Sequence, residues 1–450
     1  MLKDDHLKFI NELSVMTNKN KLNNDIYNKN EVKKGLRNSN GTGVLVGLTE
    51  IGDVQGYKID SGEKISIDGK LTYRGIDIYD LVYGFTEEHR HGFEEISYLL
   101  LFGELPNAEN LEKFNGILGL YRNPPDAFIQ DMILKAPSFD IMNKLARSVL
   151  ACYSYDNNPC DNGINNLIRQ SIELIARFPT IVAYCFQAYN HYLKDESLYI
   201  HKPNPELSTA ENFLMMIRKD GEYTKAEADL LDLSLVLHAE HGGGNNSSFT
   251  VRVVSSTGTD TYSAIAAAIG SLKGPKHGGA NIKVLEMMDD LKEKVADWED
   301  QDEIARYLEK ILLRKAFDRS GLIYGLGHAI YTLSDPRAVL LKEKALALAV
   351  GKNRVKEFNL YALIENLAPK VFARVRNTDK PLCVNVDFYS GFVYDMLNIP
   401  HELCTPLFAI SRIAGWCAHR IEELQSVNTI IRPAYKYISK GGEYVKLDQR

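Results

Sequence analysis

Helical patterns follow one another along most of this chain, and they restrict its fold more than any other feature of the sequence. From about residue 92 onward, apolar side chains recur with helical spacing, and Gly, Pro and Asn residues separate one stretch from the next. Helices with an apolar face bury that face against other helices. The sequence therefore predicts a mainly α fold, and it contains no internal repeat.

Several of these helices have recognisable starts. Thr224 and Glu227 form a capping-box pattern, which predicts a helix over residues 228–237. Proline is favoured at the first position of a helix, so Pro336 and Pro406 predict two further starts. The helix after Pro406 is expected to be long and largely apolar.

Before residue 92, one short stretch has an alternating pattern of apolar and polar residues instead of a helical one. Apolar and polar residues alternate over residues 65–67 and again over 71–73, with Asp68 and Gly69 between them. Alternation with period two is typical of strands, and Asp-Gly is a common two-residue hairpin turn. We therefore expect a small β element that turns at Asp68-Gly69, after a polar and partly helical lead-in over residues 1–40.

The composition excludes several classes of protein. The chain has 450 residues, of which 45% are hydrophobic and 25% charged, and its net charge is −6. A nucleic-acid-binding protein would need a basic stripe, and none stands out. No apolar run is long enough to span a bilayer, and the N-terminus resembles neither a signal nor a transit peptide. The six cysteines form no CxxC pair, as expected of reduced thiols in a cytoplasmic protein.

Three histidines lie in glycine-rich turns at distant points of the chain. His241 precedes glycines 242–244, His277 lies in the stretch GPKHGG, and His328 follows the glycine-rich turn 325–327. Glycine leaves both the imidazole and the neighbouring N–H groups open to a ligand. Three such turns predict an active site assembled from distant segments.

An aspartate and two arginines could complete such a site. Asp387 lies in apolar company, which should raise its pKa toward that of a general base near neutral pH. The structural alternative is that Asp387 caps a helix at Tyr389. Arg337 lies in the first turn of a predicted helix, where it could clamp a carboxylate. Arg412 lies within the apolar helix, so it needs a carboxylate partner.

Metal and phosphate motifs fit the same residues less well. His238 and His241 stand three residues apart near a helix end, so they could share a metal ion. The HAEH sequence is not the HExxH of zinc hydrolases, however, and no further ligand spacing completes a site. The stretch 274–279 has P-loop glycine spacing but lacks the following Lys-Ser/Thr, and no complete Rossmann motif occurs. We therefore expect no metal site, and we expect His238 to pack inside.

Taken together, these segments resemble the citrate synthase family. The resemblance runs in family order from residue 237 to 416, with a further match at 73–81, so it covers most of the chain beyond about residue 40. The matching segments are LHAEHGGGNNSSFT, AAAIGSLKGPKHGGAN, YGLGHAIYTLSDPRA, VNVDFYSG, FAISRIAGW, IRPAY and YRGIDIYDL.

The resemblance implies a role for each residue of the site. His277 would hydrogen-bond the thioester carbonyl of acetyl-CoA while Asp387 removes a methyl proton. His328 would donate to the ketone of oxaloacetate, and the citryl-CoA intermediate would be hydrolysed to citrate and CoA. The residues implied for oxaloacetate binding are His241, Arg337, Arg412 and Arg432, the last from the partner subunit of a homodimer.

The resemblance also implies a two-domain helical architecture. Residues 1–277 and 381–450 would form a large domain and residues 278–380 a small one, a boundary that a charged stretch at 289–306 also indicates. The active site would lie in the cleft, and closure would exclude water. The coenzyme would meet Gly325, Leu326 and Gly327. Cofactors, metals, nucleic acids and membranes are not implied as partners.

Three alternatives stay open on the sequence alone. A 2-methylcitrate synthase would use propionyl-CoA with the same residues, because one methylene changes pocket discrimination by only about 1–3 kcal/mol. A metal-dependent hydrolase would rest on His238 and His241. A non-catalytic sensor of CoA or a carboxylate would have no need of a base such as Asp387. The favoured hypothesis is therefore an acyltransferase of the citrate synthase type, which acts in the tricarboxylic acid cycle.

Overall fold

The computed structural model describes residues 4–18, 21–38, 41–61, 63–426, 429–439 and 441–450. Segment Met1–Leu48 is a compact unit by itself. It contains α1 (Asp4–Asn18), α2 (Asn24–Lys29) and the short 3-10 turn η1 (Lys34–Leu36). The expected polar, partly helical lead-in is thus confirmed for its described residues, and the rest of it falls in the gaps just given.

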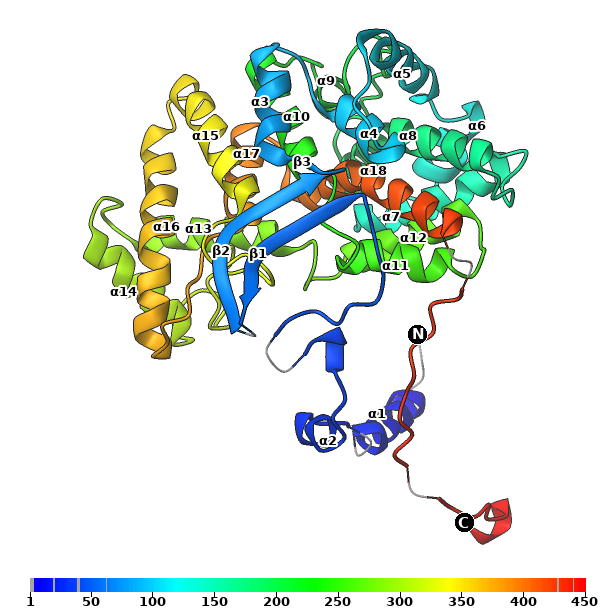
Figure 1. Cartoon of the computed structure of the whole chain (residues 1–450), viewed down its shortest axis with the longest axis vertical. Helices are drawn as coiled ribbons and strands as arrows, with labels where there is room; N and C mark the ends of the chain where they lie inside the picture. Colours follow the sequence, from blue (N-terminus) through cyan, green and yellow to red (C-terminus); the bar gives the residue numbers. More distant parts are fainter. Residues whose placement is uncertain (1–3, 19–20, 39–40, 62, 427–428, 440) are drawn as a thin grey trace. The chain divides into compact units, whose positions relative to one another are not determined.

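The second unit, Thr49–Arg450, consists of helices and one small sheet (Figure 1). Its α-helices are α3 (Ile78–Glu87), α4 (Phe93–Phe102), α5 (Ala108–Tyr121), α6 (Asp126–Phe128), α7 (Ile141–Cys152), α8 (Ile164–Leu193), α9 (Thr209–Ile217), α10 (Lys225–His238), α11 (Asn246–Ser255), α12 (Thr261–Leu272), α13 (Ala280–Lys294), α14 (Gln301–Leu312), α15 (Pro336–Gly351), α16 (Val355–Arg376), α17 (Val386–Met396) and α18 (Cys404–Gln425). Shorter helical turns are η2 (Ile129–Leu134), η3 (Tyr153–Tyr155), η4 (His401–Leu403) and η5 (Leu447–Gln449). The mainly α fold is confirmed.

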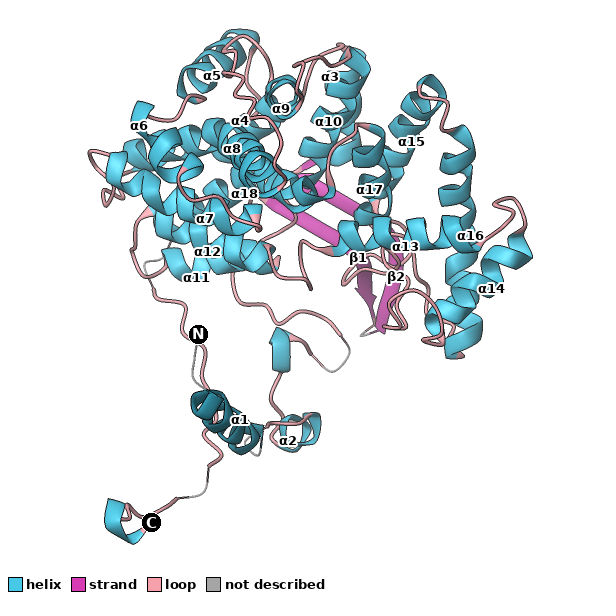
Figure 2. Ribbon diagram, turned by 180° about the vertical axis from the view of Figure 1, so that it is seen from behind, coloured by secondary structure: helices cyan, strands magenta, loops and turns pink. Residues whose placement is uncertain are grey.

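Helices α8 and α18 form the centre of this unit. They are 30 and 22 residues long and pack against each other, with α7, α11 and α12 also in contact with α18 (Figure 2). Every residue of α18 from Cys404 to Ile421 is buried, including Arg412 and Arg420. A buried guanidinium is costly unless its N–H groups find partners, so these two arginines mark places where α18 meets polar groups.

The predicted helix starts are largely confirmed. Thr224 caps α10 in the predicted capping box, although the helix begins at Lys225, before the predicted 228. Pro336 occupies the first position of α15. α18 begins at Cys404, two residues before Pro406, so the predicted start of that helix is slightly late. Caps depend on residues only three positions apart, which is why the sequence shows them.

The small sheet is confirmed, but its predicted turn is wrong. β1 (Gly52–Asp60) pairs antiparallel with β2 (Glu63–Tyr73), and β3 (Ile76–Asp77) pairs with the end of β2. Asp68 and Gly69 lie within β2, because the chain reverses between β1 and β2 instead. Asp68 and Gly69 therefore continue the strand, so a hairpin turn does not explain why residue 69 is a glycine.

The reason is a close approach of two backbones. A Cβ atom at Gly69 would overlap the Ser334 carbonyl oxygen. On β1, a Cβ atom at Gly56 would lie 2.5 Å from the Ile330 carbonyl oxygen. The Gly69 N–H also donates to the Ser334 hydroxyl at 3.0 Å. The two strands therefore press against the backbone of residues 330–336 and hold it in place.

We expect Gly69→Ala to lower the free energy of unfolding by about 1–3 kcal/mol, because the added methyl group must push the Ser334 backbone away. Urea unfolding followed by circular dichroism measures the effect. Gly84→Ala is the matched control, since a Cβ atom at Gly84 in α3 meets nothing within 4 Å and alanine favours a helix. Equal stability of the two variants would contradict the packing argument.

Helices α13 to α16 lie together on one side of the second unit (Figure 1). They make up most of residues 278–380, the segment for which the sequence predicts a small domain. Its movement as a separate domain stays a prediction. Among the described helices, none has the length and apolarity that a bilayer crossing requires.

Candidate active site

Three of the predicted residues meet around the ring of Tyr331. The ring centroids of His241 and His328 lie 5.1 Å apart, with their planes nearly perpendicular. Tyr331 stacks on His328 at 4.7 Å and meets His241 edge-on at 5.6 Å. The Arg337 guanidinium lies 5.7 Å from the Tyr331 ring centroid. Residues from distant segments thus form one group, as the sequence predicts.

The backbone determines which nitrogen of His328 carries the proton. The N–H groups of Ile330 and Tyr331 both donate to His328 Nδ1 at 3.1 Å. A ring nitrogen that accepts these bonds carries no proton, so the proton of the neutral imidazole is on Nε2. His328 is therefore arranged to donate a hydrogen bond from Nε2.

His241 presents a nitrogen that its own chain does not use. Its Nε2 atom is buried and has no hydrogen-bond partner among the described residues. Desolvation lowers the pKa of His241 well below its usual value, and the positive charge of Arg337 adds to this effect. A buried polar atom without a partner is unfavourable unless a ligand meets it. His241 is thus a neutral group suited to contact a ligand.

Asp335 connects the start of α15 to the segment that carries Asp387. Its carboxylate accepts from Arg337 Nε at 3.0 Å and from Arg337 Nη2 at 2.8 Å. The same carboxylate accepts from the Val386 N–H at 3.1 Å. A bidentate pair of this kind restricts the guanidinium to one orientation. Asp335 therefore holds Arg337 beside the start of α17.

Residues 325–327 hold the His328 turn against the same segment. The Gly325 carbonyl accepts from the Asn385 N–H, and the Gly327 carbonyl accepts from Asn385 Nδ2, both at 2.8 Å. Gly325 and Gly327 have φ values of 76° and 89°, a left-handed conformation that glycine adopts without strain. The two glycines thereby bring His328 to the start of α17.

Asp387 lies in the first turn of α17 but does not cap that helix. Asn385 is the cap, because its side-chain oxygen accepts from the Asp387 N–H at 3.0 Å. The capping alternative for Asp387 is therefore wrong. Desolvation raises the pKa of Asp387 to about 6, and the positive charges of Arg337 and Arg412 oppose a further rise. The expected rise in pKa is confirmed.

Arg412 lacks the hydrogen-bonded carboxylate partner that the sequence predicts. Its Nε donates to the His238 carbonyl at 2.6 Å, whereas Nη1 and Nη2 have no hydrogen-bond partner among the described residues. The guanidinium lies 4.8 Å from the Phe408 ring centroid. Burial lowers the pKa of Arg412 to about 10, so the group is still charged at neutral pH. An anionic ligand is what would satisfy a fully buried cation with two unpartnered donors.

His277 lies in the turn before α13, as the sequence predicts. Its Nε2 lies 3.2 Å from Ser247 Oγ, which also accepts the indole N–H of Trp416 at 3.1 Å. The single proton of the Ser247 hydroxyl can go either to Asn245 Oδ1, at 2.9 Å, or to His277 Nε2. Donation to His277 leaves the ring proton on Nδ1. Burial lowers the pKa of His277 to about 4, and the charge of Arg412 contributes. His277 is thus neutral near pH 7.

His238 packs inside the protein, as expected. Its Nδ1 lies 2.8 Å from the Ser234 carbonyl oxygen, and its ring meets Phe408 edge-on at 4.6 Å. Burial lowers the pKa of His238 to about 3. In the part of the chain that the structure describes, no group of three or more His, Cys, Asp or Glu could hold a metal ion. The geometry therefore lends no support to the metal-hydrolase alternative.

Arg432 does not join this group within its own chain. It is exposed on the segment that follows α18, and its side chain takes part in none of the hydrogen bonds or ion pairs among the described residues. The neighbouring Ile431 N–H donates to Ser256 Oγ at 3.1 Å. The contribution of Arg432 to a partner subunit stays a prediction.

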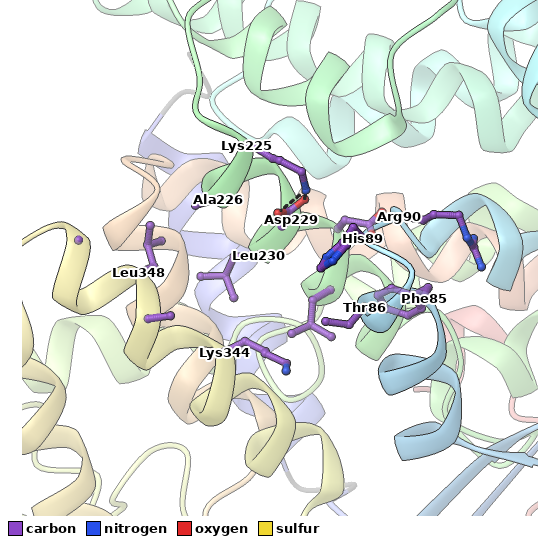
Figure 3. Close-up of a pocket in the computed structure, with 14 residues that line it drawn as sticks. Phe85, Thr86, His89, Arg90, Lys225, Ala226, Asp229, Leu230, Lys344 and Leu348 are labelled. Carbon is purple, nitrogen blue, oxygen red and sulfur yellow. Dashed lines mark hydrogen bonds and ion pairs between the residues drawn. The ribbon is translucent and has the colours of Figure 1, made fainter.

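A cavity of about 340 Å³ lies away from these residues, between α3, α10 and α15 (Figure 3). Leu230, Leu348, Lys225 and Lys344 are among the residues that line it, and none of the predicted site residues does. α10 begins at this cavity and ends three residues before His241. The cavity lies along α10 from Lys225 to Leu233, whereas the site lies beyond the C-terminal end of that helix. The cavity is therefore not the place where the predicted chemistry would occur.

Sequence reasoning missed three residues of this group. Tyr331, Ser247 and Glu240 all contact predicted site residues or their immediate neighbours. The signal that could have found them is their position, since each lies in the same motif as His241 or His328. A polar or aromatic residue within a motif does not reveal where its side chain points, and only the folded chain shows that.

Comparisons with known proteins find relatives that match most of this chain. Residues 39–434 match the family model described as citrate synthase, C-terminal domain. The citrate synthase of Haloferax volcanii is 32% identical to this chain over 93% of the chain and 99% of its own length. The chain belongs to the citrate synthase family.

Other members of the citrate synthase family are similar to this chain in sequence and in structure. The 2-methylcitrate synthase 1 of Corynebacterium glutamicum is 33% identical over 90% of this chain and 95% of its own length. The crystal structure of citrate synthase from Pyrobaculum aerophilum matches with a TM-score of 0.73 and 30% identity, over 90% of this chain and 94% of that one. As a member of the citrate synthase family, the protein is an enzyme of the transferase type.

Proposed function

We propose that the protein condenses acetyl-CoA with oxaloacetate and hydrolyses the citryl-CoA intermediate, which yields citrate and CoA. The observation that carries this proposal is Arg412, a fully buried cation whose two terminal nitrogens have no partner among the described residues. Together with Arg337, it suits a small dicarboxylate. Asp387, with its pKa near 6, supplies a base beside that anion site.

The first step is removal of a proton from the acyl methyl group. A thioester α-proton is weakly acidic, so a lone carboxylate cannot remove it unless the developing enolate is stabilised at the same moment. Asp387 would take the proton, while His277 would donate from Nδ1 to the thioester oxygen. The low pKa of His277 supports this role, because the ring is neutral near pH 7 and acts as an uncharged hydrogen-bond donor.

The second step joins the enol to the ketone. His328 would donate from Nε2 to the ketone oxygen, a role that the hydrogen bonds to its Nδ1 support. His241, Arg337 and Arg412 would hold the carboxylates, with Arg432 added from a partner subunit. The coenzyme would meet Gly325, Leu326 and Gly327.

A relative with bound ligands is consistent with this assignment. The citrate synthase of Thermoplasma acidophilum was solved as a ternary complex with carboxymethyl coenzyme A and oxaloacetate, and it matches this chain with a TM-score of 0.74 and 27% identity. We further propose that residues 278–380 close over the cleft, that the enzyme acts as a homodimer, and that it is cytoplasmic. No metal or cofactor takes part in the steps proposed here.

A second candidate function is 2-methylcitrate synthesis from propionyl-CoA. Curated relatives of similar identity include 2-methylcitrate synthases from Corynebacterium glutamicum and Shewanella oneidensis. One extra methylene changes the discrimination between the two acyl donors by only about 1–3 kcal/mol. The groups described above would therefore serve either acyl-CoA.

We expect the purified protein to release thiol from acetyl-CoA when oxaloacetate is present, and to do so with a higher kcat/KM than from propionyl-CoA. Thiol release is followed with a chromogenic disulfide, and mass spectrometry identifies the product acid. Reactions without oxaloacetate are the control for simple thioester hydrolysis. A preference for propionyl-CoA would assign 2-methylcitrate synthesis, and no thiol release from either donor would refute both functions.

A further inference from the structure

Glu240 is a buried carboxylate that the proposed reaction does not use. It lies between His238 and His241 in the sequence, and its side chain is fully buried. One oxygen, Oε1, accepts from His419 Nε2 at 2.9 Å and also from the Gly242 N–H. The other oxygen, Oε2, has no hydrogen-bond partner among the described residues. A buried carboxylate with one unpartnered oxygen is unfavourable, so its presence needs an explanation.

Glu240 Oε2 lies against α18, one turn from Arg412. A Cβ atom at Gly415 would overlap Oε2, which shows how closely the carboxylate meets the helix backbone. Among neighbouring charges, Glu240 has the largest influence on the pKa of Arg412. The two opposite charges are nevertheless not hydrogen-bonded, since Arg412 Nη1 and Nη2 have no partner among the described residues. Some other contact must keep the carboxylate from closing onto the guanidinium.

His419 hydrogen-bonds Glu240, and Arg252 sets the orientation of the His419 ring. Its Nδ1 accepts from Arg252 Nε at 3.1 Å and from Arg252 Nη2 at 2.7 Å, so the ring proton lies on Nε2 and is donated to Glu240. Arg252 in turn pairs with Glu422 and, at 3.1 Å, with Glu423. A row of side chains thus runs from the end of α18 to the Oε1 atom of Glu240.

We propose that His419 is a positioning residue that holds Glu240 away from Arg412, so that Arg412 stays available for a substrate carboxylate. Glu240 balances the charge of the buried guanidinium, while its bonds to His419 and Gly242 prevent a direct ion pair. The inference deepens the proposed function, because it assigns a determinant of oxaloacetate binding to a residue that does not touch the substrate.

The test compares two amide variants of His419. Asparagine is too short to reach Glu240, whereas the amide nitrogen of glutamine can occupy the position of Nε2. In His419→Asn, Glu240 keeps only its bond from the Gly242 N–H, so its carboxylate can turn toward Arg412. If that pair forms for nine-tenths of the time, the apparent KM for oxaloacetate rises about tenfold, with kcat within about threefold of the wild type. His419→Gln is expected to keep the KM within about threefold of the wild type.

A double variant distinguishes positioning from a general structural role. Adding Glu240→Gln to His419→Asn removes the competing negative charge, so we expect the KM to fall back toward the wild-type value. A structural role predicts the opposite, since a second substitution in the same buried row would add to the damage. If His419→Asn does not fold, Glu240→Gln alone carries the test: its KM is expected not to rise, and a tenfold rise overturns the inference.

Direct binding separates this inference from the proposed reaction. The increase in melting temperature with oxaloacetate reports the dissociation constant without any turnover. If the wild type binds oxaloacetate but releases no thiol, the proposed function fails and the His419 comparison proceeds on binding alone. If the wild type is active and His419→Asn binds oxaloacetate as tightly as His419→Gln, the inference about His419 is wrong.

Discussion

Asp387→Asn is expected to lower kcat by on the order of 10³-fold, with the KM for oxaloacetate little changed. Asparagine has the same shape as aspartate but cannot accept the acyl proton. The pKa of Asp387 is raised to about 6, and only the deprotonated carboxylate is a base. The wild-type rate should therefore be full above pH 7 and fall as the pH decreases through about 6. Steady-state kinetics between pH 5 and 8 measure both effects.

Stability provides the control for this substitution. Desolvation makes the charged form of Asp387 unfavourable in the folded protein, and the folded pKa is therefore above the ordinary value of 3.8. The charged carboxylate thus lowers the stability of the folded protein at pH 7. A neutral amide avoids that penalty, so Asp387→Asn should melt no lower than the wild type at pH 7. A variant with normal kcat would show that another group is the base, and a much lower melting temperature would point to misfolding instead.

Arg412→Leu is expected to weaken oxaloacetate binding by about 100-fold or more. A charge-assisted bidentate pair with a carboxylate in a buried site contributes about 3 kcal/mol, and every 1.4 kcal/mol changes a dissociation constant tenfold. Arg412 is suited to such a pair because its Nη1 and Nη2 are unpartnered and its Nε is anchored to the His238 carbonyl. The measurement is the rise in melting temperature with increasing oxaloacetate.

Arg420→Leu is the matched control for the Arg412 variant. Arg420 is equally buried on α18, but it donates to Ser255, Thr261 and Asn162. Its loss should lower the melting temperature and leave oxaloacetate binding within about threefold of the wild type, because its donors are already satisfied. Equal losses of binding in both variants would show that Arg412 acts through the stability of α18 alone.

Much of the site can be read from the sequence because its residues stand in short, distinctive segments. The glycines beside His241, His277 and His328 mark turns that leave an imidazole open, and the structure brings His241 and His328 together. The pattern around Asp387 predicts a raised pKa, which is confirmed. The roles of these residues in catalysis stay predictions.

The sequence by itself determined the helical class of the fold, the capped starts of α10 and α15, and the glycine-rich motifs whose histidines His241 and His328 lie together. These features depend on neighbours a few positions apart, so a linear pattern records them. Only the tertiary structure decided that Asp68 and Gly69 continue a strand. It also decided that Tyr331 packs against both His328 and His241, and that His419 hydrogen-bonds Glu240. Each of these depends on a contact between segments that are distant in the chain or on the direction of a side chain, and a local pattern contains no information about either.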